Sequence, residues 1–116
     1  MEENTTPQQE LVSIDEFAKI KLRVAQIVEA SEHPKADRLV VMKIRIGEEE
    51  RQIVAGIKKW YPPETLVGKK IIVVANLQPV VLRGVESQGM LLAASMDDRM
   101  GLLTVENDIP SGASIK

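Results

Sequence analysis

The chain has 116 residues, no cysteine, 3% aromatic residues and a formal net charge of -2. This length fits one domain and leaves no room for a catalytic domain beside it, and the lack of cysteine excludes disulfides and thiolate metal sites. No stretch approaches the ~20 apolar residues that a membrane span requires, so we expect a soluble, unprocessed, cytoplasmic protein.

The first predicted segment is a flexible acidic leader over residues 1–12, followed by one domain over residues 13–116. Residues 1–16 hold five acidic side chains and no Lys or Arg, so this segment carries -5 and the remaining hundred residues carry +3. Residues 1–9 are polar and are predicted to be disordered. The body is mildly basic, which indicates modest affinity for a nucleic acid and reliance on its shape.

A capping box predicts a short helix at the start of the domain. Ser13 and Glu16 have the S-x-x-E spacing, so we expect a helix over residues 14–19 with Phe17 facing the core. Apolar residues at 20, 22 and 24 then alternate with basic residues at 19, 21 and 23, the pattern of a half-buried strand. We interpret its basic face as a solvated row of charges rather than a phosphate-binding ridge.

Further strands are predicted at intervals of 8 to 15 residues. A loop over residues 31–37 leads to a strand over 39–46, and the turn at 47–50 closes a hairpin with a strand over 51–55 whose register stays open. Residues 58–65 read as a loop with at most one helical turn. A later strand is expected at 102–105, and the tail ends in a turn at Pro110 and Gly112.

Residues 70–95 form the segment around which we expect the rest of the fold to be arranged. Two apolar runs, 71–75 and 90–94, are predicted to be strands buried on both sides. The loop between them is rich in donors and acceptors around Pro79, Gly84 and Gly89, which suits the binding of phosphate, sugar or base edges, although such a loop is also an ordinary turn. Short strands without a long amphipathic helix predict an all-β barrel.

Four ordered strings carry a family resemblance. They are FAKIKLRVAQI at residues 17–27, HPKADRL at 33–39, RQIVAGI at 51–57, and NLxP at 76–79 followed by GVESxGMLLAA at 84–94. Together they resemble the tRNA-binding domain at the C-terminus of methionyl-tRNA synthetase and in stand-alone tRNA-binding proteins. The resemblance covers roughly residues 14–116. It implies an oligonucleotide-binding (OB) fold, a five-stranded barrel with a short N-terminal helix and a C-terminal extension.

The resemblance also implies an RNA-facing groove. It would include Lys35 to neutralise phosphate, Asn76 and Ser87 to bond sugar or base edges, and Met90 as a polarizable surface, with core packing the alternative for Met90. All but Met90 are placed on exposed loops. Two further cations are added on charge alone, Arg38 and Arg83. Because no aromatic residue falls on a predicted barrel strand, contacts to phosphate and ribose are expected to outweigh base stacking.

The sequence offers few candidate residues for catalysis or metal binding. His33 is the only histidine, it precedes Pro34 in a non-helical segment, and Asp37 four residues later does not complete a metal site. Walker-type and dinucleotide glycine patterns are absent. We expect a non-catalytic binding module without metal or cofactor.

Two functions remain after this reading. The first is a tRNA-binding module, either a β subunit or appended domain of methionyl-tRNA synthetase or a free-standing protein. The alternative is a CsaA-like peptide-binding chaperone, favoured by the apolar Val80 and Val81 where many relatives have basic residues. Apolar residues beyond the barrel, Ile109 and Ile115, predict a homodimer through residues 101–116 and the helix near residues 14–17. The alternative is a monomer whose C-terminal extension folds back onto its own barrel.

Overall fold

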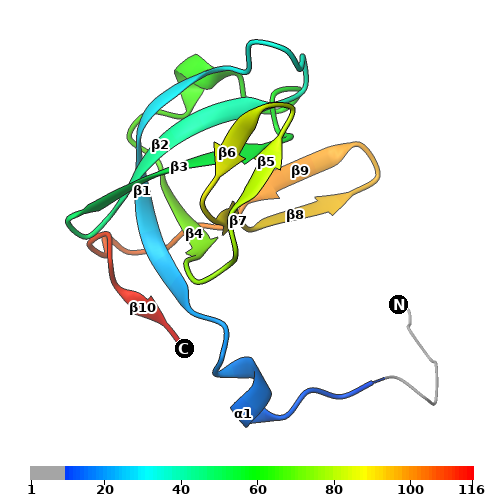
Figure 1. Cartoon of the computed structure of the whole chain (residues 1–116). Helices are drawn as coiled ribbons and strands as arrows, with labels where there is room; N and C mark the ends of the chain where they lie inside the picture. Colours follow the sequence, from blue (N-terminus) through cyan, green and yellow to red (C-terminus); the bar gives the residue numbers. More distant parts are fainter. Residues whose placement is uncertain (1–9) are drawn as a thin grey trace.

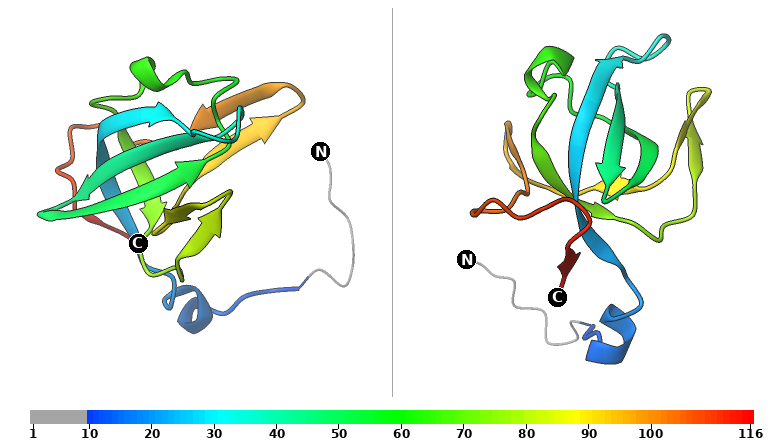
Figure 2. Two further views of the ribbon diagram at one scale, coloured as in Figure 1. Left: turned by 45° about the horizontal axis from the view of Figure 1, so that its top comes forward. Right: turned by 90° about the vertical axis from the view of Figure 1, so that its left-hand side faces the viewer.

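The chain folds into a mostly β structure, seen in a computed structural model that describes residues 10–116. Its elements are α1 (Ile14–Phe17), β1 (Leu22–Glu32), β2 (Val40–Ile46), β3 (Glu49–Ala55), η1 (Pro63–Thr65), β4 (Lys70–Val74), β5 (Val80–Leu82), β6 (Val85–Ser87), β7 (Met90–Leu91), β8 (Ala93–Met96), β9 (Arg99–Leu102) and β10 (Ser114–Ile115). The main sheet has the order β3-β2-β1-β4-β7, and β10 pairs with β1 (Figure 1). Two hairpins, β5–β6 and β8–β9, leave this sheet in different directions (Figure 2). Neither helical segment of the described part is long enough or apolar enough to cross a membrane.

The sheet curls because β1 is long and is shared by several neighbours. Residues 22–26 pair with β4 and residues 26–32 pair with β2, both antiparallel, and a bulge lies between Ile27 and Glu29. A bulge bends a strand and increases its twist. The result is the curled half-barrel of an OB-like fold, which confirms the all-β class predicted from the sequence.

The core fills the inside of this curl. Alternate residues of β2 point inward, and Leu66, just after η1, is buried with them. A two-residue turn with Gly47 at φ 63° fixes the hairpin register that the sequence left open, from Ile46↔Glu49 to Val40↔Ala55. The largest fully buried side chains are Ile27, Met42, Ile44, Ile53, Leu66 and Ile71.

The N-terminal capping box is confirmed, but the helix stands off the barrel. The Ser13 hydroxyl accepts a hydrogen bond from the Glu16 N–H at 3.0 Å, and the Ser13 N–H donates to the Glu16 carboxylate at 3.1 Å. The prediction that Phe17 faces the core is wrong, because its side chain is 43% exposed and α1 buries no residue. Ile20 is exposed too, since β4 and β10 reach along β1 only as far as Leu22. The expected disorder of residues 1–9 lies outside the described residues.

The prediction of one buried strand over residues 90–94 is wrong. The run divides into β7 and the start of β8, and of its residues Leu91 is buried while Met90 is 46% exposed. The reason is that β4 provides partners for these two residues alone, after which the chain turns outward into the β8–β9 hairpin. The last predicted strand is also displaced, since β9 covers Arg99–Leu102 rather than residues 102–105.

The C-terminal segment folds back along its own barrel. The Gly112 N–H donates to the Val24 carbonyl at 2.7 Å, and Lys70 Nζ binds the Asp108 carboxylate at 2.7 Å. Gly112 has φ 95°, and a Cβ there would lie 2.9 Å from the Gly47 Cα, so only glycine fits this contact. The middle of the tail therefore belongs to the barrel's own structure, while β10 lies beside α1.

Candidate nucleic-acid interface

The loop over residues 33–39, which joins β1 to β2, is folded around a buried histidine. His33 is 5% exposed, and its Nδ1 accepts a hydrogen bond from the Lys35 N–H at 2.9 Å. The His33 N–H donates to the Leu39 carbonyl at 3.2 Å, which closes the loop at its base. Lys35 and Arg38 remain exposed on this compact loop.

His33 also connects the loop to the β5–β6 hairpin. Its Nε2 lies 3.0 Å from the Leu82 carbonyl oxygen. Because the Lys35 N–H already occupies Nδ1 as an acceptor, Nε2 must carry the proton and donate to Leu82. One neutral imidazole thus joins two segments that lie 49 positions apart in the chain.

The tip of the hairpin places a third cation beside this loop. Arg83 and Gly84 both have positive φ values, 52° and 91°, as the tightest hairpin turns require. The Arg83 guanidinium donates to the Lys35 carbonyl at 3.4 Å. Lys35, Arg38 and Arg83 line one hollow of about 480 Å³ with Ala36, Asp37 and Leu39, which we call the cation hollow.

The base of the hairpin is held by a buried hydroxyl. Ser87 is 1% exposed, and its Oγ accepts from the Val54 N–H and donates to the Gly89 carbonyl, both at 2.9 Å. Its expected position on an exposed loop is therefore wrong, because β6 lies against β3 and buries it. Gln52 Nε2 adds a bond to the Glu86 carbonyl at 2.8 Å. These bonds fix the direction in which the hairpin carries Arg83.

Asn76 precedes the β5–β6 hairpin and Met90 follows it, and neither residue lines the cation hollow. Asn76 Oδ1 accepts from the Lys21 N–H at 2.8 Å and its Nδ2 donates to the Lys19 carbonyl at 2.6 Å, so the side chain ties the α1–β1 connection to the end of β4. Met90 is exposed, so the alternative that it packs in the core is wrong and its side chain is available for contact. The structure thus brings together the three predicted cations and spreads the other three predicted residues along the hairpin base.

In the part of the chain that the structure describes, two carboxylates have shifted pKa values, and neither lines the cation hollow. A hydrogen bond and the charge of Arg51 lower the pKa of Glu49, and Lys70 lowers the pKa of Asp108 in the same way. Glu49 lies in β3 and Asp108 in the C-terminal segment, so both carboxylates belong to the barrel and its tail rather than to the cation hollow.

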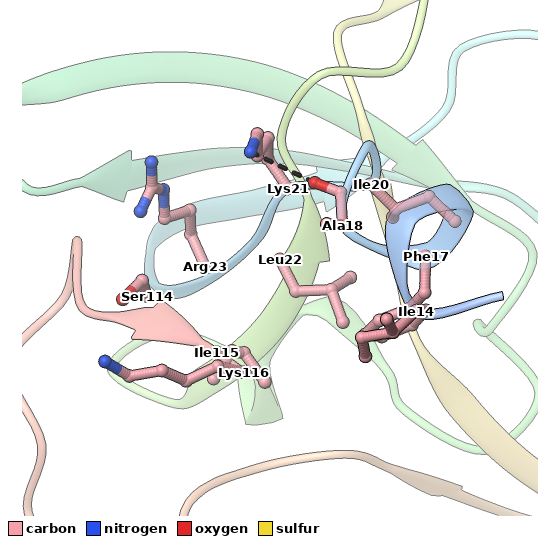
Figure 3. Close-up of a pocket in the computed structure, with 10 residues that line it drawn as sticks. All are labelled: Ile14, Phe17, Ala18, Ile20, Lys21, Leu22, Arg23, Ser114, Ile115 and Lys116. Carbon is pink, nitrogen blue, oxygen red and sulfur yellow. Dashed lines mark hydrogen bonds between the residues drawn. The ribbon is translucent and has the colours of Figure 1, made fainter.

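A separate cleft of about 350 Å³ lies between α1 and β10 (Figure 3). We call it the apolar cleft, because five apolar side chains are among the residues that line it: Ile14, Phe17, Ile20, Leu22 and Ile115. Lys21 Nζ, at its edge, donates to the Ala18 carbonyl at 3.0 Å.

Sequence reasoning missed two residues of this region. His33 was considered for catalysis and metal binding, whereas its role is to join the loop to the hairpin. Trp60 falls in the loop predicted over residues 58–65, to which the sequence assigns no function, yet it lines a second hollow that shares Arg38 with the cation hollow. The string HPKADRL marks the His33 loop in the sequence, but nothing local marks the partner Leu82.

Residues 22–114 match the family model described as "Putative tRNA binding domain". The chain is 54% identical over 107 residues to a methionine–tRNA ligase of Thermococcus kodakarensis, and 57% identical over 104 residues to one of Caldanaerobacter subterraneus. These alignments cover 92% and 90% of the chain but 14% and 16% of the relatives. The chain therefore spans about one sixth of the length of the curated relatives it matches.

Solved structures show the same fold over whole chains. A MetRS-related protein from Pyrococcus horikoshii superposes with a TM-score of 0.87 at 40% identity, covering 93% of this chain and 100% of that one. The chaperone CsaA from Bacillus anthracis superposes with a TM-score of 0.84 at 28% identity, covering 92% and 100%. Both neighbours therefore share the overall fold of this chain.

Proposed function

The chain belongs to the tRNA-binding domain family, and on that premise we propose that it is a non-catalytic module that binds folded tRNA by shape and backbone. The observation that carries the proposal is the meeting of Lys35 and Arg38 from one loop with Arg83 from a hairpin tip in one hollow. Cations from separate segments can contact phosphates that the fold of an RNA, rather than its sequence, brings together.

The binding mechanism follows from charge. Among residues 10–116, Asp37 is the one carboxylate that lines the cation hollow, against three cations, so a phosphate meets a net positive surface. Each phosphate neutralised releases counterions, and log K falls with log salt by roughly 0.7 to 0.9 per phosphate. We propose that Asn76 and Met90, near the hairpin base, extend the contact, and that Ser87 acts by supporting the hairpin.

The partners follow from the relatives. Since methionine–tRNA ligases contain a segment like this chain, we propose that it works in the cytoplasm, appended to or beside a methionyl-tRNA synthetase subunit. A tethered tRNA-binding module raises the effective concentration of tRNA near a catalytic site without any new catalytic contact. The chain itself contributes affinity and no chemical step.

We propose further that two copies pair through the apolar cleft. Its wall carries Ile14 and Phe17, which α1 leaves exposed beside β10. An isologous dimer would cover them and place two cation hollows on one assembly. Light scattering at micromolar concentration should give twice the chain mass, and Ile14→Glu should reduce it to one chain. Val67→Glu, at an exposed apolar residue outside the cleft, is the matched control and should stay dimeric.

A peptide-binding chaperone is the second candidate. It is favoured by the exposed apolar side chains of Leu77, Val80, Val81 and Met90 along the β5–β6 side and by the likeness to the chaperone CsaA. Burial of apolar peptide groups is far less sensitive to salt than neutralisation of phosphate. Salt dependence therefore separates the two candidates.

The deciding experiment is filter binding of bulk tRNA at increasing salt. We expect the wild-type affinity to fall steeply, and Lys35→Ala with Arg38→Ala to reduce the slope by roughly 1.4 to 1.8. Lys43→Ala removes the same kind of charge from an exposed position on β2, outside the cation hollow, and should leave the slope unchanged. Binding that is absent at low salt, or that ignores salt, contradicts the proposal and leaves the chaperone ahead.

A further inference from the structure

Trp60 is held in a fixed orientation between two segments. It lies in the turn after β3, where the Trp60 and Tyr61 N–H groups donate to the Ile57 carbonyl at 3.0 and 2.8 Å. The indole Nε1–H donates to the Asp98 carbonyl at 3.0 Å, at the tip of the β8–β9 hairpin. An aromatic ring fixed at both its backbone and its edge is a preorganised surface.

This ring lines a hollow of about 620 Å³, which we call the Trp60 hollow. Its other walls are Arg38, Gly56, Lys59, Asp97 and Asp98. Arg38 also lines the cation hollow, so the two hollows adjoin at this one side chain. A nucleotide whose phosphate contacts Arg38 therefore has the Trp60 hollow within reach of its base.

The charges that line the Trp60 hollow are balanced, unlike those that line the cation hollow. Lys59 Nζ binds the Asp98 carboxylate at 2.6 Å and lies 5.4 Å from the centre of the Trp60 ring. With this pair neutralised, Arg38 and Asp97 remain, one of each sign. A balanced, partly aromatic lining does not select a phosphate. It suits a neutral, flat group with hydrogen-bond donors at its edge, which the Asp97 carboxylate accepts.

We infer that the Trp60 hollow is a subsite for one unpaired nucleobase of a bound RNA. The inference rests on the proposed function and deepens it: Arg38 holds the phosphate, the Trp60 indole stacks on the base, and Asp97 accepts from amino or imino groups of the base. Unpaired bases in loops and at ends are what proteins stack on aromatic side chains.

The chain's single tryptophan makes a direct measurement possible, because Trp60 is the only indole that emits. We expect titration of the wild-type protein with tRNA to quench its emission in parallel with binding measured on filters. The probe for comparison is a blunt RNA duplex, which offers phosphates but no unpaired base; it should bind at low salt and leave the emission nearly unchanged. Equal quenching by the duplex, or tRNA binding without quenching, overturns the inference and leaves the proposed function standing.

Two substitutions test the stack itself. Trp60→Leu should weaken tRNA binding by about 5- to 160-fold, as loss of one base–aromatic stack does, while the salt slope stays as in the wild type because no phosphate contact is lost. Trp60→Phe keeps a ring and should stay within about threefold. Met96→Ser, at an exposed residue of the same hairpin outside the Trp60 hollow, is the control and should bind normally.

The outcomes of these experiments distinguish failure of the subsite from failure of the proposed function. A Trp60→Leu protein that melts like the wild type and binds tRNA equally well overturns the subsite. A loss of affinity shared by Trp60→Phe and Met96→Ser overturns it too, since the hairpin's position rather than the ring would then be responsible. If the wild type binds no tRNA at all on filters, the proposed function fails and the subsite fails with it.

Discussion

The two hairpins that leave the sheet are attached to the barrel by different kinds of contact. In β5–β6, the buried Ser87 bonds the Val54 N–H and the Gly89 carbonyl, and His33 reaches the Leu82 carbonyl. In β8–β9, every residue of β8 is exposed, and the tip is held by Asp98 through bonds with Lys59 and Trp60.

The difference matters because buried and exposed bonds have unequal energetic weight. Losing a partner in a buried pair leaves a polar group unsatisfied, at about 1–3 kcal/mol, whereas an exposed ion pair contributes roughly 0–1 kcal/mol. The β5–β6 hairpin is therefore fixed in place by the fold, and it is the one that carries a cation into the cation hollow. The β8–β9 hairpin rests on the core through Met100 and Leu102 of β9, while the ion pair at its tip is exposed.

The largest expected effect is on the free energy of unfolding, and it is tested with one serine from each hairpin. Ser87→Ala should lower the free energy of unfolding by about 1–3 kcal/mol, because the Val54 N–H and the Gly89 carbonyl lose their buried partner. Ser95→Ala in β8, at an exposed position, should stay within about 0.5 kcal/mol. Denaturant unfolding of both variants checks this, and equal effects would remove the distinction between the hairpins.

A second prediction concerns the two ring nitrogens of His33. An Asn in place of His33 can still accept the hydrogen bond from the Lys35 N–H, but it does not reach the Leu82 carbonyl. A Gln in place of His33 can donate to the Leu82 carbonyl, but it loses the hydrogen bond from the Lys35 N–H. His33→Asn should weaken tRNA binding by about 2- to 10-fold, as expected from one lost hydrogen bond, and His33→Gln should weaken it less. Filter binding with both variants decides. The opposite order would show that the loop's own shape, rather than its link to the hairpin, positions the cations.

The smallest effect is expected at the tip of β8–β9. Asp98→Asn removes the ion pair with Lys59, whose side chains are 77% and 61% exposed, while the backbone carbonyl that holds Trp60 remains. The free energy of unfolding should fall by no more than about 0.5 kcal/mol, and the change should vanish at high salt. Thermal melts at low and high salt measure it. A larger loss that does not depend on salt would mean that the β8–β9 hairpin is attached to the barrel as firmly as β5–β6.

The sequence predicted the parts of this molecule that depend on local pattern. The capping box at Ser13, the β2–β3 hairpin and the buried β4 follow from side chains within a few positions of one another, and each is confirmed. The all-β class also follows, because many short strands with turns between them leave few other architectures.

The failures share a physical reason, which is dependence on distant partners. Phe17 is exposed because no strand extends beneath α1, and Ser87 is buried because β6 lies against β3, 33 residues earlier at Val54. Neither contact has a signal in the neighbouring sequence. For the same reason the three cations could be named from their charge and strings, while His33, which connects their segments, could not be recognised.

The central claim is that the loop over residues 33–39 and the β5–β6 hairpin form one phosphate-binding surface, to which the β8–β9 hairpin adds no charge. The most direct test compares the salt dependence of tRNA binding for Arg83→Ala and Arg99→Ala, which remove one arginine from each hairpin. We predict that Arg83→Ala lowers the slope of log K against log salt by roughly 0.7 to 0.9, and that Arg99→Ala leaves it at the wild-type value. An unchanged slope for Arg83→Ala, or an equal drop for Arg99→Ala, would contradict the account.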